Sequence, residues 1–113
     1  MQTPKTSEIL ILTIDAEVGR KVQCLGMVHA ESCLCRWIGK DIMASVRNWT
    51  IGGELETYTK IMNESVELIT DRLLAQAEVL GADAIYGLRF STSTIVQGAA
   101  ELIGYGTAVR YVD

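Results

Sequence analysis

The chain has 113 residues, nearly half of them apolar, and a formal net charge of −4. This length suits one domain that buries a core without disulfides. The ten basic residues are scattered, which argues against a nucleic-acid partner. No run approaches the roughly 18 apolar residues of a membrane span. An odd number of cysteines and an N-terminus without a signal-peptide pattern favour reduced thiols and a cytoplasmic location.

The N-terminal part of the chain predicts a tail and two strands. Residues 1–7 are polar and contain the only proline, so we expect a flexible tail. Residues 8–14 (EILILTI) are a β-rich run. The stretch DAEVGR that follows, with Gly19, predicts a hairpin turn into a second strand over 21–35. Gly26 within that strand predicts a β-bulge or a close backbone approach.

Two helices are predicted in the middle of the chain. Residues 36–49 carry apolar side chains at helical spacing and predict a short amphipathic helix. Gly52 and Gly53 end it. The stretch 54–80 contains neither proline nor glycine and predicts a helix roughly 40 Å long. Gly81 stands where a C-cap residue belongs.

The long helix carries two apolar rows. The first, with residues three and four apart, comprises Leu55, Tyr58, Met62, Val66, Ile69, Leu73, Ala77 and Leu80. The second, about a third of a turn away, comprises Ile61, Leu68, Ala75 and Val79. Either the rows form one broad face, or one packs on the chain's own sheet and the other on a neighbouring subunit. Ser65, Arg72 and Gln76 lie between them, where Arg72 needs an acidic or carbonyl partner.

The C-terminal third predicts two more strands. Residues 82–94 alternate and predict a strand with one apolar face through Phe90. Residues 100–112 predict a last strand, interrupted by Gly104 and Gly106. The complete order of elements predicts an α+β domain, with a mainly antiparallel sheet and one dominant helix laid across it.

The candidate metal ligands are His29, Glu31, Cys33 and Cys35. Alternate residues of a strand share one face, and these side chains offer the N, O and S ligands of a zinc- or copper-like ion. Alternate residues of a strand lie about 6.5–7 Å apart. These four side chains can therefore meet at one ion only if the strand bends or if several subunits supply the ligands. Alternatively, the two cysteines are small buried apolar residues, as free cysteine commonly is. Cys24, on the other face, is predicted to be core.

Catalytic groups are sparse. His29 is the only histidine, and nothing marks it as the base of a catalytic thiol. Glu31 and Glu101 stand in otherwise uncharged stretches, where each could carry a proton or accept backbone N–H bonds. The glycines form neither a phosphate loop nor a dinucleotide motif. We therefore expect a non-catalytic protein.

Five sequence motifs occur along the chain in an order that is also found in one protein family. They are LG-x-V at 25–28 with Glu31, KDIMASVRN at 40–48, GGELETY at 52–58, LGADAIYG at 80–87 and E-LIG-YGTAV at 101–109. Together they resemble the YbjQ-like family, described as a "putative heavy-metal-binding" domain, over about residues 21–112.

The resemblance implies a dodecin-like β-α-β-β arrangement in a homo-oligomeric ring, typically a homopentamer, with the long helices outside the sheets. It implies no established reaction. The residues that match the family motifs, expected at an interface or pocket, are Gly26, Glu31, Arg47, Gly52, Gly53, Tyr58, Glu101, Gly106 and Thr107. Small or apolar residues are usual in the family at His29, Cys33 and Cys35, so a thiol site there is particular to this chain.

Three functions are compatible with these observations. The first is a non-catalytic, ring-forming protein that binds a heavy-metal ion. The second is a structural or protein-interaction module. The third is a small-molecule-binding protein or enzyme whose site lies at the subunit interface.

Overall fold

The computed structural model describes residues 8–33, 52–96 and 99–113. Their elements are β1 (Leu10–Ile11), β2 (Lys21–Cys33), α3 (Gly52–Leu80), β3 (Ala84–Val96) and β4 (Ala99–Val112). The sheet order is β1-β3-β4-β2, in which β4 is antiparallel to both its neighbours and β1 is parallel to β3. The predicted α+β class, the mainly antiparallel sheet and the β-α-β-β order are confirmed.

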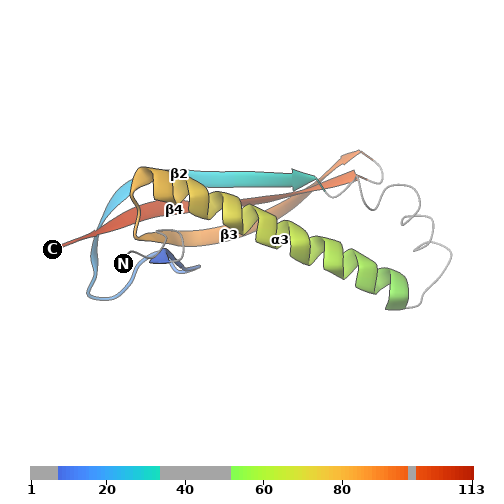
Figure 1. Cartoon of the computed structure of the whole chain (residues 1–113), viewed down its shortest axis with the longest axis horizontal. Helices are drawn as coiled ribbons and strands as arrows, with labels where there is room; N and C mark the ends of the chain where they lie inside the picture. Colours follow the sequence, from blue (N-terminus) through green and yellow to red (C-terminus); the bar gives the residue numbers. More distant parts are fainter. Residues whose placement is uncertain (1–7, 34–51, 97–98) are drawn as a thin grey trace, which may run out of the picture.

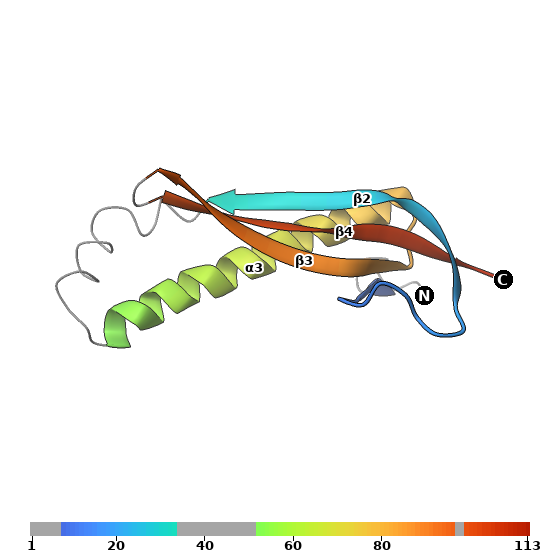
Figure 2. The ribbon, with the colours of Figure 1, turned by 180° about the vertical axis from the view of Figure 1, so that it is seen from behind.

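Helix α3 lies diagonally across one face of the sheet, where it contacts β2 and β4 (Figure 1). Its 29 residues give a length of about 43 Å. The N-terminal half of α3 diverges from the strands, so the molecule is elongated, with extents of 58 × 30 × 23 Å. The opposite face of the sheet is turned away from α3 (Figure 2).

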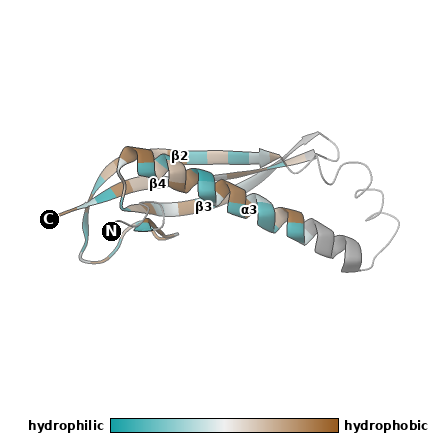
Figure 3. Cartoon of the chain, in the orientation of Figure 1, coloured by the Kyte–Doolittle hydropathy of each residue, from teal (hydrophilic) through white to brown (hydrophobic). Residues whose placement is uncertain are grey.

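The first predicted apolar row of the helix is the buried one. Ile69, Leu73 and Ala77 expose no surface. The sheet residues in the same core cluster include Val28, Ala30, Ile85, Leu102 and Ala108. Leu80 is 41% exposed, so the row leaves the core at the end of the helix. Apolar and polar residues recur along α3 (Figure 3), as expected for a helix with one buried side.

Strand β4 has no side chain at two crowded points. A Cβ atom at Gly104 would lie 2.6 Å from Ile69 Cγ2, and one at Gly106 would lie 2.8 Å from Ile85 Cγ2. The two glycines therefore make room for core side chains, and Gly104 lets α3 pack against the main chain of β4. The interruption predicted at these two glycines is wrong, because β4 continues through both positions.

The predicted hairpin between the first two strands is wrong. β1 has only two residues and pairs in parallel with β3, with Leu10 opposite Ala84. The pairing continues beyond β1, where the Leu12 N–H donates to the Ile85 carbonyl at 2.8 Å. The apolar run therefore adds an edge to β3. The sequence pattern identifies such a run but not its partner strand.

Bulges reverse the alternation of side chains along the sheet. The β2–β4 register shifts between Cys24 and Gly26, and the β3–β4 register shifts between Tyr86 and Arg89 and again, near the end of β3, between Thr94 and Val96. Gly26 has φ of 137° and Gly87, within the second bulge, has φ of 67°, a range that favours glycine. A bulge adds one residue, so positions on its two sides follow opposite alternation. The bulge predicted at Gly26 is confirmed.

The ends of α3 differ slightly from expectation. The helix begins at Gly52 rather than near residue 54, so the glycine pair forms its first turn. The C-cap at Gly81 is confirmed, because its N–H donates to the Glu78 carbonyl at 3.0 Å. The predicted tail over 1–7 and short helix over 36–49 lie outside the described residues. So do Cys35 and Arg47.

Candidate functional site: the open face of the sheet

The face of the sheet turned away from α3 carries the His29–Glu31 pair and a pocket, and we call it the open face. Val28 and Ala30 of β2 are buried under α3, so the residues that alternate with them point to the other side. The register places the following side chains on the open face: Met27, His29, Glu31, Tyr86, Arg89, Ser91, Ile103, Tyr105 and Thr107.

His29 and Glu31 form a pair on this face, as the alternation predicted. The His29 Nδ1 atom lies 3.2 Å from Glu31 Oε2, and about half of each side chain is exposed. An imidazole beside a carboxylate could supply two ligands to a metal ion. The pair alone does not complete a site.

The third predicted ligand, Cys33, lies farther along β2. It is opposite Glu101 in the β2–β4 register and is disulfide-bonded, so its sulfur is not a thiolate here. Among residues 8–33, 52–96 and 99–113, no three or more His, Cys, Asp or Glu side chains converge as a metal site. Any complete site built on His29 and Cys33 therefore needs groups from elsewhere.

Polar side chains of α3 hold the outer edge of β2. The Gln76 side-chain amide donates to the His29 carbonyl at 2.6 Å, and its oxygen accepts the His29 N–H at 3.0 Å. The Arg72 guanidinium donates to the Glu31 carbonyl at 3.1 Å. The predicted need of Arg72 for an acidic or carbonyl partner is confirmed. These contacts fix the strand that carries the His29–Glu31 pair.

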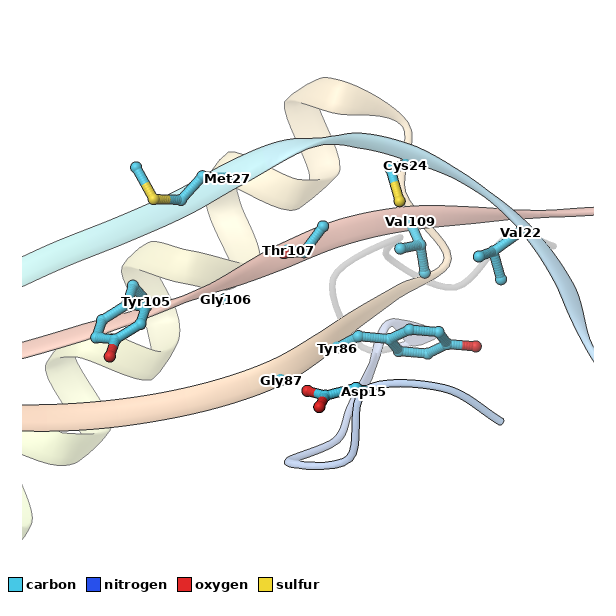
Figure 4. Close-up of a pocket in the computed structure, with 10 residues that line it drawn as sticks. All are labelled: Asp15, Val22, Cys24, Met27, Tyr86, Gly87, Tyr105, Gly106, Thr107 and Val109. Carbon is cyan, nitrogen blue, oxygen red and sulfur yellow. The ribbon is translucent and has the colours of Figure 1, made fainter. Parts of the chain in front are cut away.

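A pocket of about 370 Å³ opens on the open face beside the bulges at Gly26 and Gly87 (Figure 4). Its lining residues are Asp15, Val22, Cys24, Met27, Tyr86, Gly87, Tyr105, Gly106, Thr107 and Val109. The side chains of Val22, Met27 and Val109 and the tyrosine rings make it mainly apolar. Gly106 and Thr107 are family-motif residues, and Gly26 forms the adjoining bulge.

Cys24 is not a core residue, contrary to the prediction. It is an exposed free thiol and lines the pocket together with Met27. Strict alternation places residues 24 and 27 on opposite faces, but the bulge at Gly26 inserts one residue between them. The bulge at Gly26 is predictable from the sequence, but the side of the sheet to which Cys24 points depends on which strand carries the extra residue.

Beside the pocket, a carboxylate latch attaches the N-terminal segment to the sheet. The Tyr86 hydroxyl donates to Glu17 Oε1 at 2.7 Å, and the Tyr111 hydroxyl donates to the same oxygen at 3.0 Å. The Arg20 guanidinium stacks 3.8 Å from the centre of the Tyr111 ring. Residues from the N-terminal segment, β3 and β4 are therefore joined at one point, which the sequence did not predict.

The latch shifts the pKa values of its members in opposite directions. The hydrogen bond from Tyr86 is the main cause that lowers the pKa of Glu17 below its ordinary 4.5. Burial, followed by the hydrogen bond to Glu17, raises the pKa of Tyr86 to about 12. Stability from Glu17 is therefore present above pH 4.5 and lost as the pH falls through its lowered pKa. Stability from Tyr86 is present below pH 10.0 and lost as the pH rises through about 12.

We expect Glu17→Gln to remove the acid-side contribution of the latch. Urea unfolding from about pH 6 to pH 3 should show a smaller loss of stability in the variant than in the parent. The pKa of Tyr86, followed by NMR, should fall from about 12 but stay above 10.0, because burial persists. Glu67→Gln, at an exposed position of α3, is the control. If Glu17→Gln loses as much stability as the parent when the pH falls over this range, the latch is contradicted.

In the part of the chain that the structure describes, fold and site define a small α+β protein with a β2-α3-β3-β4 unit, a helix layer formed by α3, and an open sheet face. The chain belongs to the YbjQ-like family described as "Putative heavy-metal-binding", whose model matches residues 9–112. A UPF0145 protein of Thermus thermophilus is 43% identical over 104 residues, which are 91% of this chain and 90% of that protein. One from Methanosarcina acetivorans is 39% identical over 106 residues, which are 93% and 99% of the two chains.

A solved structure supports the fold independently. The crystal structure of a DUF74 protein of unknown function from Pediococcus pentosaceus matches with a TM-score of 0.60 at 21% identity. The match covers 92% of this chain and 98% of that one.

Within the described residues, helix α3 is not long and apolar enough to cross a membrane.

The other family-motif residues are not gathered at the pocket. Glu31 lies opposite Ile103, and Glu101 lies opposite Cys33, two pairs farther along the β2–β4 ladder. Gly52, Gly53 and Tyr58 belong to the first two turns of α3, at the end of the helix that diverges from the sheet (Figure 1). The family motifs therefore mark several parts of the fold rather than one ligand set.

Proposed function

We propose that this protein is a non-catalytic, cytoplasmic binding protein that assembles as a homopentameric ring and binds a heavy-metal ion. The family description supports metal binding, and the family resemblance supports the ring. The observation that carries self-association is the second apolar row of α3, which the chain's own sheet leaves exposed.

The exposure of this second row is pronounced. Val79 is 87% exposed and Leu68 is 42% exposed, and Ala75 between them is also exposed. Ile69 and Leu73 of the first row, by contrast, have no exposed surface. Because exposed apolar side chains gain stability by losing contact with water, the outer row favours a contact with another chain.

The open face offers a second, different apolar surface. Met27 is 66% exposed and Tyr105 is 40% exposed. It lies on the opposite side of the sheet from α3, so one chain carries two unlike apolar surfaces. Contact between unlike surfaces of successive copies is head-to-tail, and such contacts close into rings when the rotation permits. This arrangement supports a ring over a two-fold dimer.

For the metal ion, the proposed ligands are His29, Cys33 and Cys35. The His29–Glu31 pair supplies an imidazole and a carboxylate at 3.2 Å, and Cys33 supplies a thiolate only after its disulfide is reduced. The His29 Nδ1 atom lies beside a carboxylate, an arrangement that commonly orients metal-ligating histidines, which supports a binding role.

Light scattering at micromolar concentration tests the assembly. The parent should have a mass about five times that of the 12.4 kDa chain. Leu68→Lys combined with Val79→Lys should lower this mass, because two charges would be desolvated at the contact. Glu78→Lys, at an exposed polar position of the same helix, should retain it. A folded parent that remains a single 12.4 kDa chain would contradict the ring.

Metal analysis tests the binding proposal. Protein purified without an affinity tag, under reducing conditions, should retain zinc or copper. The combined Cys33→Ser and Cys35→Ser variant should retain less, and so should His29→Ala. Unchanged uptake in both variants would show that these residues are not the ligands.

A further inference from the structure

The pocket on the open face contains two sulfur side chains that the proposed ligand set does not use. Cys24 is an exposed free thiol, and Met27 is 66% exposed. Both line the same cavity of about 370 Å³. They face the same side because the bulge at Gly26 lies between them.

We propose that Cys24 and Met27 form a binding site for a soft monovalent metal ion, Cu(I) or its analogue Ag(I). The proposal rests on the metal binding proposed above and assigns a second site, separate from His29 and Cys33. The Cys24 thiol loses its proton as the metal–sulfur bond forms, and the Met27 thioether donates a lone pair. No redox step is involved.

The spacing of the two residues permits this coordination. Cys24 lies opposite Val109 and Met27 opposite Thr107, so their main chains are separated by about two strand residues, or about 6.7 Å. Two metal–sulfur bonds of about 2.3 Å each bridge sulfurs about 4.6 Å apart, which both side chains can reach. Figure 4 shows the Met27 thioether directed away from Cys24, so binding requires it to turn. The three rotatable bonds of its flexible side chain permit that turn.

The charge of the site selects the type of ion. One thiolate and one monovalent cation form a neutral unit, which an apolar pocket can accept at little cost. Zn²⁺ in the same place would keep a net charge and take four ligands. Among the described residues, no cluster of three His, Cys, Asp or Glu groups supplies them. The carboxylate at the pocket, Asp15, lies 3.8 Å from the Arg89 guanidinium. Thiolate and thioether ligands favour Cu(I) over harder ions.

The test uses Ag(I), which does not change oxidation state, in competition with glutathione, which has a thiol but no thioether. The starting protein carries Cys33→Ser and Cys35→Ser, so that Cys24 is its only thiol. We expect this protein to retain one Ag(I) ion by native mass spectrometry, with a shift of the Met27 methyl signal by NMR. Cys24→Ser should abolish both effects, and Met27→Leu should weaken binding at least about tenfold.

Met62→Leu is the matched control, because it removes a thioether from α3 rather than from the pocket, and it should bind as the starting protein does. If Met27→Leu binds Ag(I) as tightly as the starting protein does, the Cys24 thiol binds the ion without the thioether, and the proposal is overturned. Retention of Zn²⁺ in place of Ag(I) would overturn the assigned ion. If the parent binds metal but the protein without Cys33 and Cys35 does not, the proposed function stands and this second site fails. If neither binds, both fail.

Discussion

Replacing Gly104 with alanine should lower the free energy of unfolding by about 1–3 kcal/mol. The new methyl group would lie 2.6 Å from Ile69 Cγ2 and 3.0 Å from Phe90 Cε1, closer than carbon atoms pack. Ile69 is fully buried and cannot move aside without shifting α3 from the sheet. Urea denaturation measures the effect as a lower midpoint at an unchanged slope.

A double-mutant cycle with Ile69→Ala isolates this contact. Ile69→Ala alone should cost about 2–5 kcal/mol, because it leaves a cavity. The new methyl at Gly104 would occupy part of that space. The double variant should therefore lose less unfolding free energy than the two single variants lose together, by about 0.5–3 kcal/mol. Strictly additive losses would mean that the two positions do not meet.

Replacing Gln76 with alanine should lower the free energy of unfolding by about 1–3 kcal/mol, because two hydrogen bonds are lost at about 0.5–1.5 kcal/mol each. Its side-chain amide forms both bonds with the main chain of His29, at 2.6 and 3.0 Å. The variant should also exchange the His29 amide hydrogen faster, as measured by NMR.

Two further variants separate hydrogen bonding from packing. Gln76→Met keeps the approximate shape of the side chain but neither hydrogen bond, so it should behave like the alanine variant. Gln23→Ala removes an amide that contacts the Arg110 side chain instead of a strand edge, and it should leave the exchange of His29 unchanged. If Gln76→Met retains parent stability and slow exchange, the side chain acts through packing alone.

The sequence predicted the helix and its buried row because these depend on local periodicity. The repeat through Ile69, Leu73 and Ala77 requires one covered side, whatever the rest of the chain does. Arg72 between the rows was also informative, since a guanidinium buried there would need an acidic or carbonyl partner. The structure supplies that partner, the Glu31 carbonyl of β2, whereas the bonds from Gln76 to β2 were not predicted.

Strand pairing could not be predicted in the same way. The choice between a β1–β2 hairpin and a parallel β1–β3 pair depends on contacts between residues about 74 positions apart, such as Leu10 and Ala84, and no local pattern reports them. The latch joining Glu17 to Tyr86 and Tyr111 is equally non-local. The sequence therefore predicted the elements and several candidate residues, but not the pocket that the bulges and the N-terminal segment create.

Two bulges of the sheet constrain how the chain can change in length. At the bulges around Gly26 and around Gly87, the side chains that face α3 change from one set of alternate positions to the other. Removing or adding one residue at either place would exchange interior for exterior along the rest of that strand. We expect insertions and deletions to be excluded at these two points and tolerated in the turn around Gly19, where no such frame exists.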